Sequence, residues 1–115
     1  MEYLVCERQE GCVFCKCSTR CDDYVLFEGK HCFIILNRYP YVNGHLMIIP
    51  ERHLGGFEEL TALERTEIFD LLDVAVKVLK EAMQPDGFNV GMNLGKAAGA
   101  GIAEHVHMHV IPRWE

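Results

Sequence analysis

The sequence lacks an excess of positive charge. Its 115 residues contain 11 lysines and arginines against 17 aspartates and glutamates, which gives a formal net charge of −6. This balance argues against general nucleic-acid binding, because that function needs a basic surface. It also means that a phosphate-bearing ligand must be attracted by a local site and not by the overall field.

Long apolar runs and targeting segments are also missing. The first residues, Met1 to Val5, contain neither a basic stretch nor a long apolar run, so the sequence predicts no secretory signal and no membrane span. A cytoplasmic location is the matching expectation. With no internal repeat, low-complexity tract or linker, the length and the 50% hydrophobic content fit a single domain over residues 1–115.

Three histidines alternate with apolar residues near the C-terminus, within residues 104–113. Successive side chains of a strand point to opposite faces. His105, His107 and His109 are therefore predicted to share one face that looks into a cleft, while the apolar residues between them face the core. Neutral imidazole is a nucleophile and a proton carrier near pH 7, because its reference pKa is about 6.5.

A small, glycine-rich segment, residues 93–101, precedes these histidines. Such backbone can approach an anion closely and offer it N–H groups. Imidazole next to such donors supplies the parts of a covalent phosphoryl or nucleotidyl transfer site. Two other interpretations stay open: a metal site or buried histidine pair on an ordinary strand, and a catalytic metalloenzyme that uses all three histidines as zinc ligands.

The histidine run resembles the signature of the histidine-triad (HIT) family of nucleotide hydrolases and transferases. The resemblance also includes residues 33–40, residues 44–50 and Asn93-Leu94-Gly95, and it extends over residues 12–114. It implies a HIT-like α+β fold, in which one long helix packs on an antiparallel sheet. It also implies that the substrate is a nucleotide of the adenine type.

The local patterns agree with that fold class. Strands are predicted at residues 24–28, 31–36, 45–49 and 88–93 and at the histidine run, the first two joined by a hairpin at Gly29-Lys30. A helix is predicted from a capping box at Thr61 and Glu64 to Met83. Its apolar stripe, which begins at Leu63, is broader than one sheet needs. Family members pair through this helix and an adjoining strand, so the resemblance implies a homodimer.

The resemblance gives roles to the candidate site residues. His107 would be the nucleophile that attacks the α-phosphorus, and His109 would donate a hydrogen bond to the phosphate oxygens. The other expected substrate-binding residues are Asn37 at the ribose, Asn93 with the backbone N–H groups of Gly101 and Ile102 at the phosphates, and Phe14 and Ile35 at the base. From the residues alone, Asn37 could equally end a strand in a turn, and Phe14 could be a core residue.

Six cysteines lie in the first third of the chain, and Cys12 and Cys15 form a C-x-x-C half-site for tetrahedral zinc. Without a signal peptide, metal binding is favoured over disulfides. The resemblance supplies His53 and His105 as the remaining ligands. Four protein ligands leave no open position, so the expected zinc is structural. Cys17 could replace Cys15, and reduced surface thiols are the alternative.

Residues 93–101 and 37–40 resemble the diadenosine tetraphosphate hydrolase and phosphorylase branch of the family. The expected reaction is therefore cleavage at the α-phosphate of a dinucleoside polyphosphate through a nucleotidyl-histidine. Lys96 and Arg113 could meet the extra charges of a polyphosphate leaving group. A nucleoside phosphoramidase and a non-catalytic, nucleotide-binding regulatory module are the alternatives.

Overall fold

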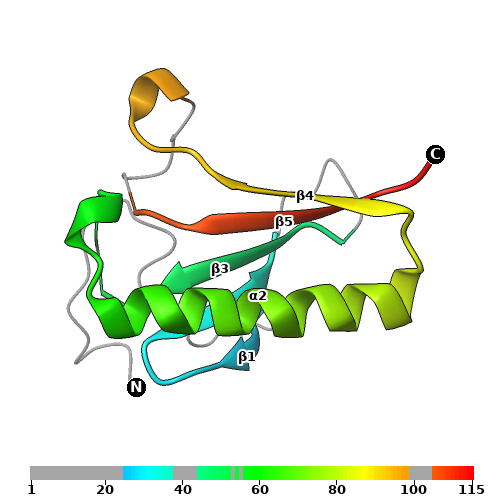
Figure 1. The fold of residues 1–115 in the computed structure, drawn as a ribbon, viewed down its shortest axis with the longest axis horizontal. Helices are drawn as coiled ribbons and strands as arrows, with labels where there is room; N and C mark the ends of the chain where they lie inside the picture. Colours follow the sequence, from blue (N-terminus) through cyan, green and yellow to red (C-terminus); the bar gives the residue numbers. More distant parts are fainter. Residues whose placement is uncertain (1–24, 38–43, 53, 55, 99–104) are drawn as a thin grey trace.

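The computed structural model describes residues 25–37, 44–52, 54, 56–98 and 105–115. These residues form a five-stranded sheet and one long helix, α2 (Figure 1). The strands are β1 (Val25–Glu28), β2 (Cys32–Leu36), β3 (Leu46–Pro50), β4 (Gly87–Met92) and β5 (Met108–Arg113). They lie in the order β1-β2-β3-β5-β4, and every neighbouring pair is antiparallel. The predicted α+β class is confirmed.

Helix α2 runs over Ala62–Met83 and begins at the predicted capping box. The Thr61 hydroxyl accepts the backbone N–H of Glu64 at 3.1 Å, and the Glu64 carboxylate accepts the N–H of Thr61 at 2.8 Å. These bonds satisfy donors that the first turn of a helix leaves unpaired. The helix ends at Gln84, whose left-handed backbone (φ 51°) stops the run. Two short 3-10 turns, η2 (Phe57–Glu59) and η3 (Lys96–Ala98), complete the described elements.

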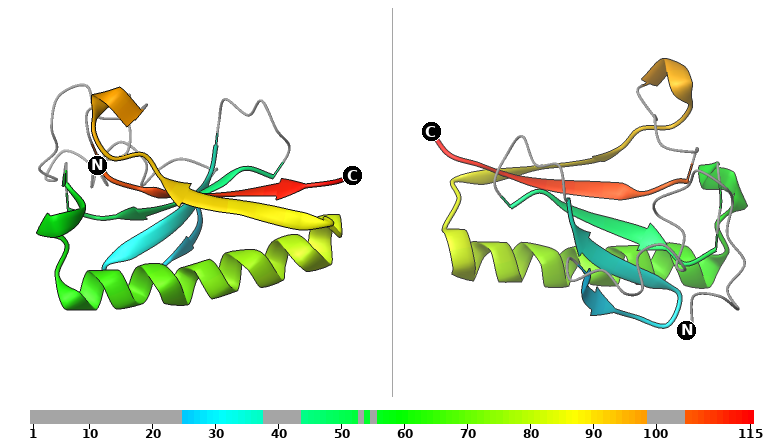
Figure 2. Two further views of the ribbon diagram at one scale, coloured as in Figure 1. Left: turned by 45° about the horizontal axis from the view of Figure 1, so that its top comes forward. Right: turned by 180° about the vertical axis from the view of Figure 1, so that it is seen from behind.

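The main core lies between α2 and the sheet face that the helix covers (Figure 2). The helix contributes Ile68, Leu71, Ala75 and Leu79, all at most 4% exposed. Strand residues opposite them include the apolar partners of the histidine run, Val106, Met108 and Val110, so the predicted inward face of that run is confirmed. Each fully buried aliphatic side chain contributes roughly 1.5–3 kcal/mol, which makes this layer the main source of stability.

The other face of the sheet, which we call the open face, carries the histidine side of β5. A smaller apolar cluster lies there on β2 and β3, made of Phe33, Ile35, Met47 and Ile49. All four are at most 5% exposed. Phe33 and Ile35 therefore face the same side of their strand.

The predicted stripe on the helix was partly wrong. Leu63 and Val78 are 66% and 48% exposed, whereas Glu64, placed outside the stripe by the sequence pattern, is 3% exposed. Adjacent residues on a helix point about 100° apart, so the line through Glu64 and Ile68 that faces the sheet leaves Leu63 outside. Burial of the Glu64 carboxylate is made possible by Arg52, whose Nε and Nη2 lie 2.8 Å and 2.9 Å from its two oxygens.

Strand β5 is shorter than predicted. It begins at Met108, so only His109 of the three histidines lies inside a regular strand. The backbone N–H of Val106 donates to the carbonyl of Leu54 at 2.6 Å. This bond joins the start of the run to the segment after β3, outside the regular pairing of β5.

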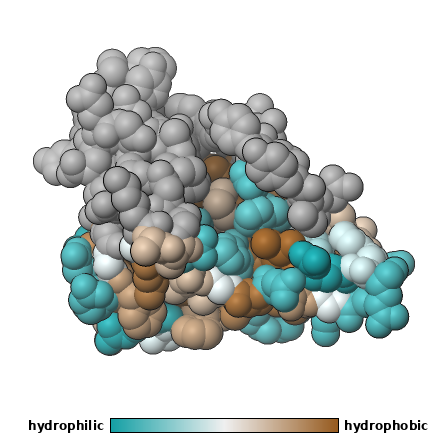
Figure 3. Space-filling model, turned by 90° about the horizontal axis from the view of Figure 1, so that it is seen from above, coloured by the Kyte–Doolittle hydropathy of each residue, from teal (hydrophilic) through white to brown (hydrophobic). Residues whose placement is uncertain are grey.

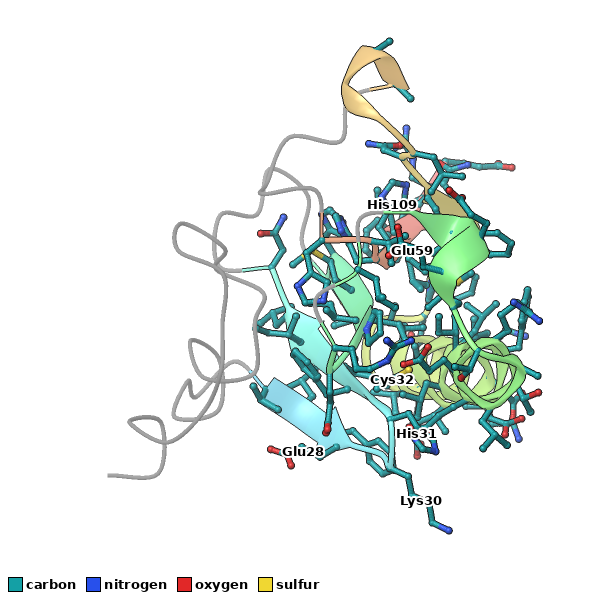
Figure 4. All side chains as sticks on the ribbon, turned by 90° about the vertical axis from the view of Figure 1, so that its left-hand side faces the viewer. Glu28, Lys30, His31, Cys32, Glu59 and His109 are labelled. Carbon is teal, nitrogen blue, oxygen red and sulfur yellow. The ribbon has the colours of Figure 1, made fainter. Side chains whose placement is uncertain are left out.

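The predicted β1–β2 hairpin is confirmed, and the helix holds it in place. The Glu67 carboxylate accepts the backbone N–H groups of His31 and Cys32, each at 2.9 Å. A Cβ on Gly29 would overlap that carboxylate, which explains the glycine. Figure 4 shows His31 and Cys32 beside the start of α2, and β3 separates β2, which begins at Cys32, from the strand of His109. Across the described residues, no helix is long and apolar enough to cross a membrane.

Candidate functional site

His107 and His109 bring two imidazole rings together at the start of β5. The ring centroids lie 6.4 Å apart, with the planes at 66°. His109 pairs with Met47 of β3 on one side and with Gly91 of β4 on the other. The sheet order therefore places His109 on an inner strand, where its backbone is held from both sides.

The hydrogen bond of His107 fixes which of its nitrogens carries the proton. Its Nδ1 lies 3.0 Å from the backbone carbonyl of His105. A carbonyl only accepts, so Nδ1 donates, and Nε2 keeps the lone pair. Burial lowers the pKa of His107 below its usual value, and nearby His109 also lowers it, while the His105 carbonyl acts in the opposite direction. The ring is thus neutral near pH 7, with a nucleophilic Nε2.

His109 is partly buried, and burial lowers its pKa as well. A third ring, His45, meets it edge to face with centroids 5.8 Å apart. His45 directly precedes β3, and its own pKa is lowered by burial first and then by His109 and His107. The three rings are more stable side by side when they are neutral, because positively charged rings at this separation would repel one another.

Asn37, at the end of β2, is bonded to the same histidine. Its side-chain Nδ2 lies 3.0 Å from His45 Nδ1, and its backbone N–H donates to the His45 carbonyl at 2.9 Å. An amide nitrogen only donates, so His45 Nδ1 accepts and Nε2 carries the hydrogen. That Nε2 is buried, and none of the described residues forms a hydrogen bond with it. Sequence reasoning missed this contact between His45 and Asn37.

The structure describes two of the remaining predicted substrate-binding residues, Ile35 and Asn93. Ile35 is buried on the open face and lies, through Met47, in register with His109. Asn93 follows β4 directly and is partly buried. The other predicted contacts, Phe14, Gly101 and Ile102, lie outside the described residues.

Of the four predicted zinc ligands, His105 lies within the described residues, and Cys12, Cys15 and His53 lie outside them. His105 is 2% exposed, and its Nε2 lies 2.9 Å from the carbonyl of Pro50. Nε2 must therefore donate, which leaves the lone pair on Nδ1. Histidines that bind metals commonly donate their other N–H to a backbone carbonyl, so the orientation of His105 fits a zinc ligand.

The three histidines of the run do not form one metal centre. Within the described ranges, no group of three His, Cys, Asp or Glu side chains is arranged to hold an ion. The interpretation of the run as three catalytic zinc ligands is therefore wrong. This conclusion does not concern the zinc site predicted from Cys12, Cys15, His53 and His105, because the first three of these ligands lie outside the described residues.

The structure is thus an antiparallel sheet covered by one helix, with a histidine run that leads into an inner strand. The family model described as "HIT domain" matches residues 18–115. The chain belongs to the histidine-triad family.

Several known proteins are similar to this chain in sequence or in structure. An AP-4-A phosphorylase of Mycobacterium tuberculosis is 48% identical over 90 residues, which cover 78% of this chain and 46% of that protein. The chain thus spans about half the length of this curated relative. Among solved structures, a HIT family protein from Bacillus anthracis superposes with a TM-score of 0.82 and 29% identity over 94% of this chain and 77% of that one.

A zinc-bound histidine-triad family protein from Mycobacterium smegmatis also shares the fold. It superposes with a TM-score of 0.70 and 26% identity, covering 78% of this chain and 65% of that one. These neighbours and the family match agree with the predicted HIT-like fold.

Proposed function

We propose that this chain is a nucleotide hydrolase or transferase that cleaves a dinucleoside polyphosphate, such as diadenosine tetraphosphate, at its α-phosphate. The observation that carries the proposal is the orientation of His107. Its Nδ1–H is held by the His105 carbonyl at 3.0 Å, so its Nε2 has a lone pair and its ring is kept neutral by burial. A prepared nucleophile of this kind suits covalent catalysis.

In the first step, His107 Nε2 attacks the α-phosphorus. A P–N bond forms while the P–O bond to the bridging oxygen breaks, and the rest of the polyphosphate leaves with the bonding electron pair. The imidazole becomes positively charged, and the His105 carbonyl stabilises that charge by accepting Nδ1–H. His109 donates a hydrogen bond to the phosphate oxygens, where negative charge develops.

In the second step, an acceptor oxygen attacks the same phosphorus, a P–O bond forms and the P–N bond breaks. His107 returns to its neutral state. With water as acceptor, the water releases one proton to solvent and the product is a nucleoside monophosphate. With inorganic phosphate as acceptor, the product is a nucleoside diphosphate. Similarity to the AP-4-A phosphorylase of M. tuberculosis, at 48% identity over 90 residues, supports a polyphosphate substrate and phosphate as an acceptor.

Asn37 is proposed to bind the ribose, with His45 fixing its orientation. One N–H of the Asn37 amide is directed at His45 Nδ1, so the amide cannot rotate freely. An amide can both donate and accept hydrogen bonds, so Asn37 has the chemistry to bind ribose hydroxyls. Ile35 is proposed to lie against the base, and Asn93 to contact the phosphates, together with Phe14, Gly101 and Ile102 from outside the described residues.

A structural zinc held by Cys12, Cys15, His53 and His105 is proposed to fix the start of the histidine run. The His105 Nδ1 lone pair fits this role, and the ion would serve as a cross-link between distant segments. Because His105 would be held there, its carbonyl would be a rigid acceptor for His107. No chemical step uses the metal.

A homodimer is the proposed assembly. β4 is an edge strand with an exposed Val90 (45%), and α2 exposes Leu63 and Phe69 (66% and 61%). Figure 3 looks onto the molecule from the side of β4 and shows hydrophobic residues among hydrophilic ones there. Unpaired strand edges and exposed apolar side chains favour association with a second copy.

A substrate panel tests the proposal. We expect kcat/KM for diadenosine tetraphosphate to exceed that for an adenosine phosphoramidate, and the rate to rise when inorganic phosphate is added. His109→Ala should lower kcat by roughly 100-fold to 1000-fold, the usual loss when one donor to a developing anion is removed. Preference for the phosphoramidate would reassign the leaving group and favour the P–N hydrolase alternative. Binding without turnover of any member would favour the regulatory module.

A further inference from the structure

Gly91 lies inside β4, and no backbone requirement accounts for it. Glycine in a strand interior costs roughly 0.5–1 kcal/mol relative to alanine. Among the described glycines, positive φ occurs at Gly44 and Gly95 and not at Gly91. A strand glycine with no conformational reason often marks a place where a ligand or another backbone comes close.

The space over Gly91 adjoins the imidazole of His109. The two residues are direct partners in the β4–β5 register, so they share the open face. A Cβ built on Gly91 would lie 3.5 Å from His109 Nε2, and the described residues place no other atom within 4 Å of it. Any side chain at position 91 would therefore lie against that nitrogen, and the glycine keeps the approach to it open.

One row of residues crosses the open face through His109. The strand registers pair Ile35 with Met47, Met47 with His109, and His109 with Gly91. Neighbouring strands lie about 4.8 Å apart, so Ile35 and Gly91 lie on opposite sides of His109. A nucleotide with its base toward Ile35 and its α-phosphate at His109 must extend its remaining phosphates toward Gly91.

The neighbours of this space suit an anion. Asn89 lies two residues before Gly91 on the same face of β4, and Asn93 lies two residues after it; each amide offers two N–H donors. Across the strand pair, the same face of β5 carries His109, Ile111 and Arg113. These positions contain no carboxylate, although the chain as a whole has a net charge of −6. Phosphate oxygens would therefore meet N–H donors and no carboxylate from these strand positions.

We propose that the gap over Gly91, bounded by Asn89, Asn93 and His109, is the subsite for the phosphates beyond the α-phosphate. The inference rests on the proposed function in placing the α-phosphate beside His107 and His109. In the first step the subsite holds the leaving polyphosphate next to the breaking P–O bond. The acceptor enters from the same side, because the second displacement reverses the direction of the first.

Nucleotide binding tests the subsite without depending on turnover. AMP and ATP are titrated calorimetrically into His107→Ala protein, so that neither nucleotide is consumed, and then into the same protein with Gly91→Ala or Gly91→Val. The control is Gly87→Ala, which adds the same methyl group to the same face of β4 at a position where a Cβ meets no atom of the described residues within 4 Å. Thermal melting of each variant checks the fold, and valine should not lower stability, since strands favour it over glycine.

The expected result is that ATP binds at least tenfold more weakly to the Gly91 variants, more so for valine, while AMP affinity changes less than twofold. The Gly87→Ala control should match its parent for both nucleotides. Equal ATP affinity in all variants would overturn the subsite, as would an equal loss for AMP and ATP. If the parent binds AMP but gains nothing from the added phosphates, the subsite is wrong while the proposed function stands. A parent that binds neither nucleotide contradicts both.

Discussion

The buried ion pair at the start of α2 gives a prediction whose size follows from the structure. Glu64 has a side chain only 4% exposed, whereas that of its partner Arg52 is 54% exposed. The carboxylate accepts two N–H groups from Arg52 and one from Thr61 at 2.8–2.9 Å. We expect Glu64→Gln to destabilise the fold, because an amide cannot replace the charge and offers a single acceptor oxygen.

The magnitude follows from the pKa of the carboxyl group. The hydrogen bond from Arg52 is the largest cause that lowers the pKa of Glu64 from 4.5 to about 2. One pKa unit corresponds to about 1.4 kcal/mol, which sets an upper limit near 3 kcal/mol. Solvent screens the half-exposed Arg52, so a loss of about 1–2 kcal/mol at pH 7 is the reasonable expectation. For a domain of this size, that is a Tm lower by about 4–8 °C.

The sign of the pH dependence is fixed as well. A carboxyl group whose pKa is lower in the folded state stabilises the fold above its unfolded pKa and loses that contribution as the pH falls through the folded pKa. The Tm difference between wild type and Glu64→Gln should therefore be full above pH 4.5 and shrink toward pH 2. Scanning calorimetry at several pH values measures it.

Asp73→Asn is the matched control, since it breaks an ion pair with Lys77 on the same helix whose side chains are 63% and 74% exposed. It should change Tm little at any pH. The reasoning would be refuted if Glu64→Gln matched this control at pH 7, or if its Tm deficit stayed constant from pH 5 to pH 2.5.

Three further predictions concern the hairpin, the metal and the assembly. Glu67→Ala should cost about 2 kcal/mol in chemical denaturation, because it leaves the N–H groups of His31 and Cys32 without their charged acceptor; a midpoint equal to wild type would be inconsistent with this role. Protein purified without chelator should contain about one zinc per chain by elemental analysis, and Cys12→Ser should lower both zinc content and Tm; metal-free wild-type protein of undiminished Tm would rule out a structural zinc. Light scattering should give twice the chain mass of 13.1 kDa at micromolar concentration, and a monomer mass would disprove the dimer.

The fold could be predicted from the sequence wherever local pattern and burial coincide. The capping box at Thr61 and Glu64, the hairpin at Gly29 and the alternation from Val106 to Val110 each depend on neighbours along the chain. What the sequence could not show depends on contacts between distant segments. The burial of Glu64 requires Arg52, twelve residues away, and no periodicity records that partner.

The same limit applies to the site. The histidine run identified His107 and His109, but the proton positions on their rings follow from backbone carbonyls and burial. The contact between Asn37 and His45 joins the residue after β2 to the residue before β3. The pairing of Gly91 with His109 exists only in the β4–β5 register. A glycine inside an otherwise regular strand pattern was the one signal that could have drawn attention to Gly91.

Trapping the covalent intermediate tests the central claim most directly. Wild-type protein is mixed with diadenosine tetraphosphate, quenched within one turnover in alkaline denaturant, which preserves P–N bonds to histidine, and examined by intact and peptide mass spectrometry. The account predicts one added adenylyl group on His107, none in His107→Ala, and loss of turnover in that variant with its Tm unchanged. Adenylylation of a different residue, or turnover of His107→Ala at the wild-type rate, would contradict it.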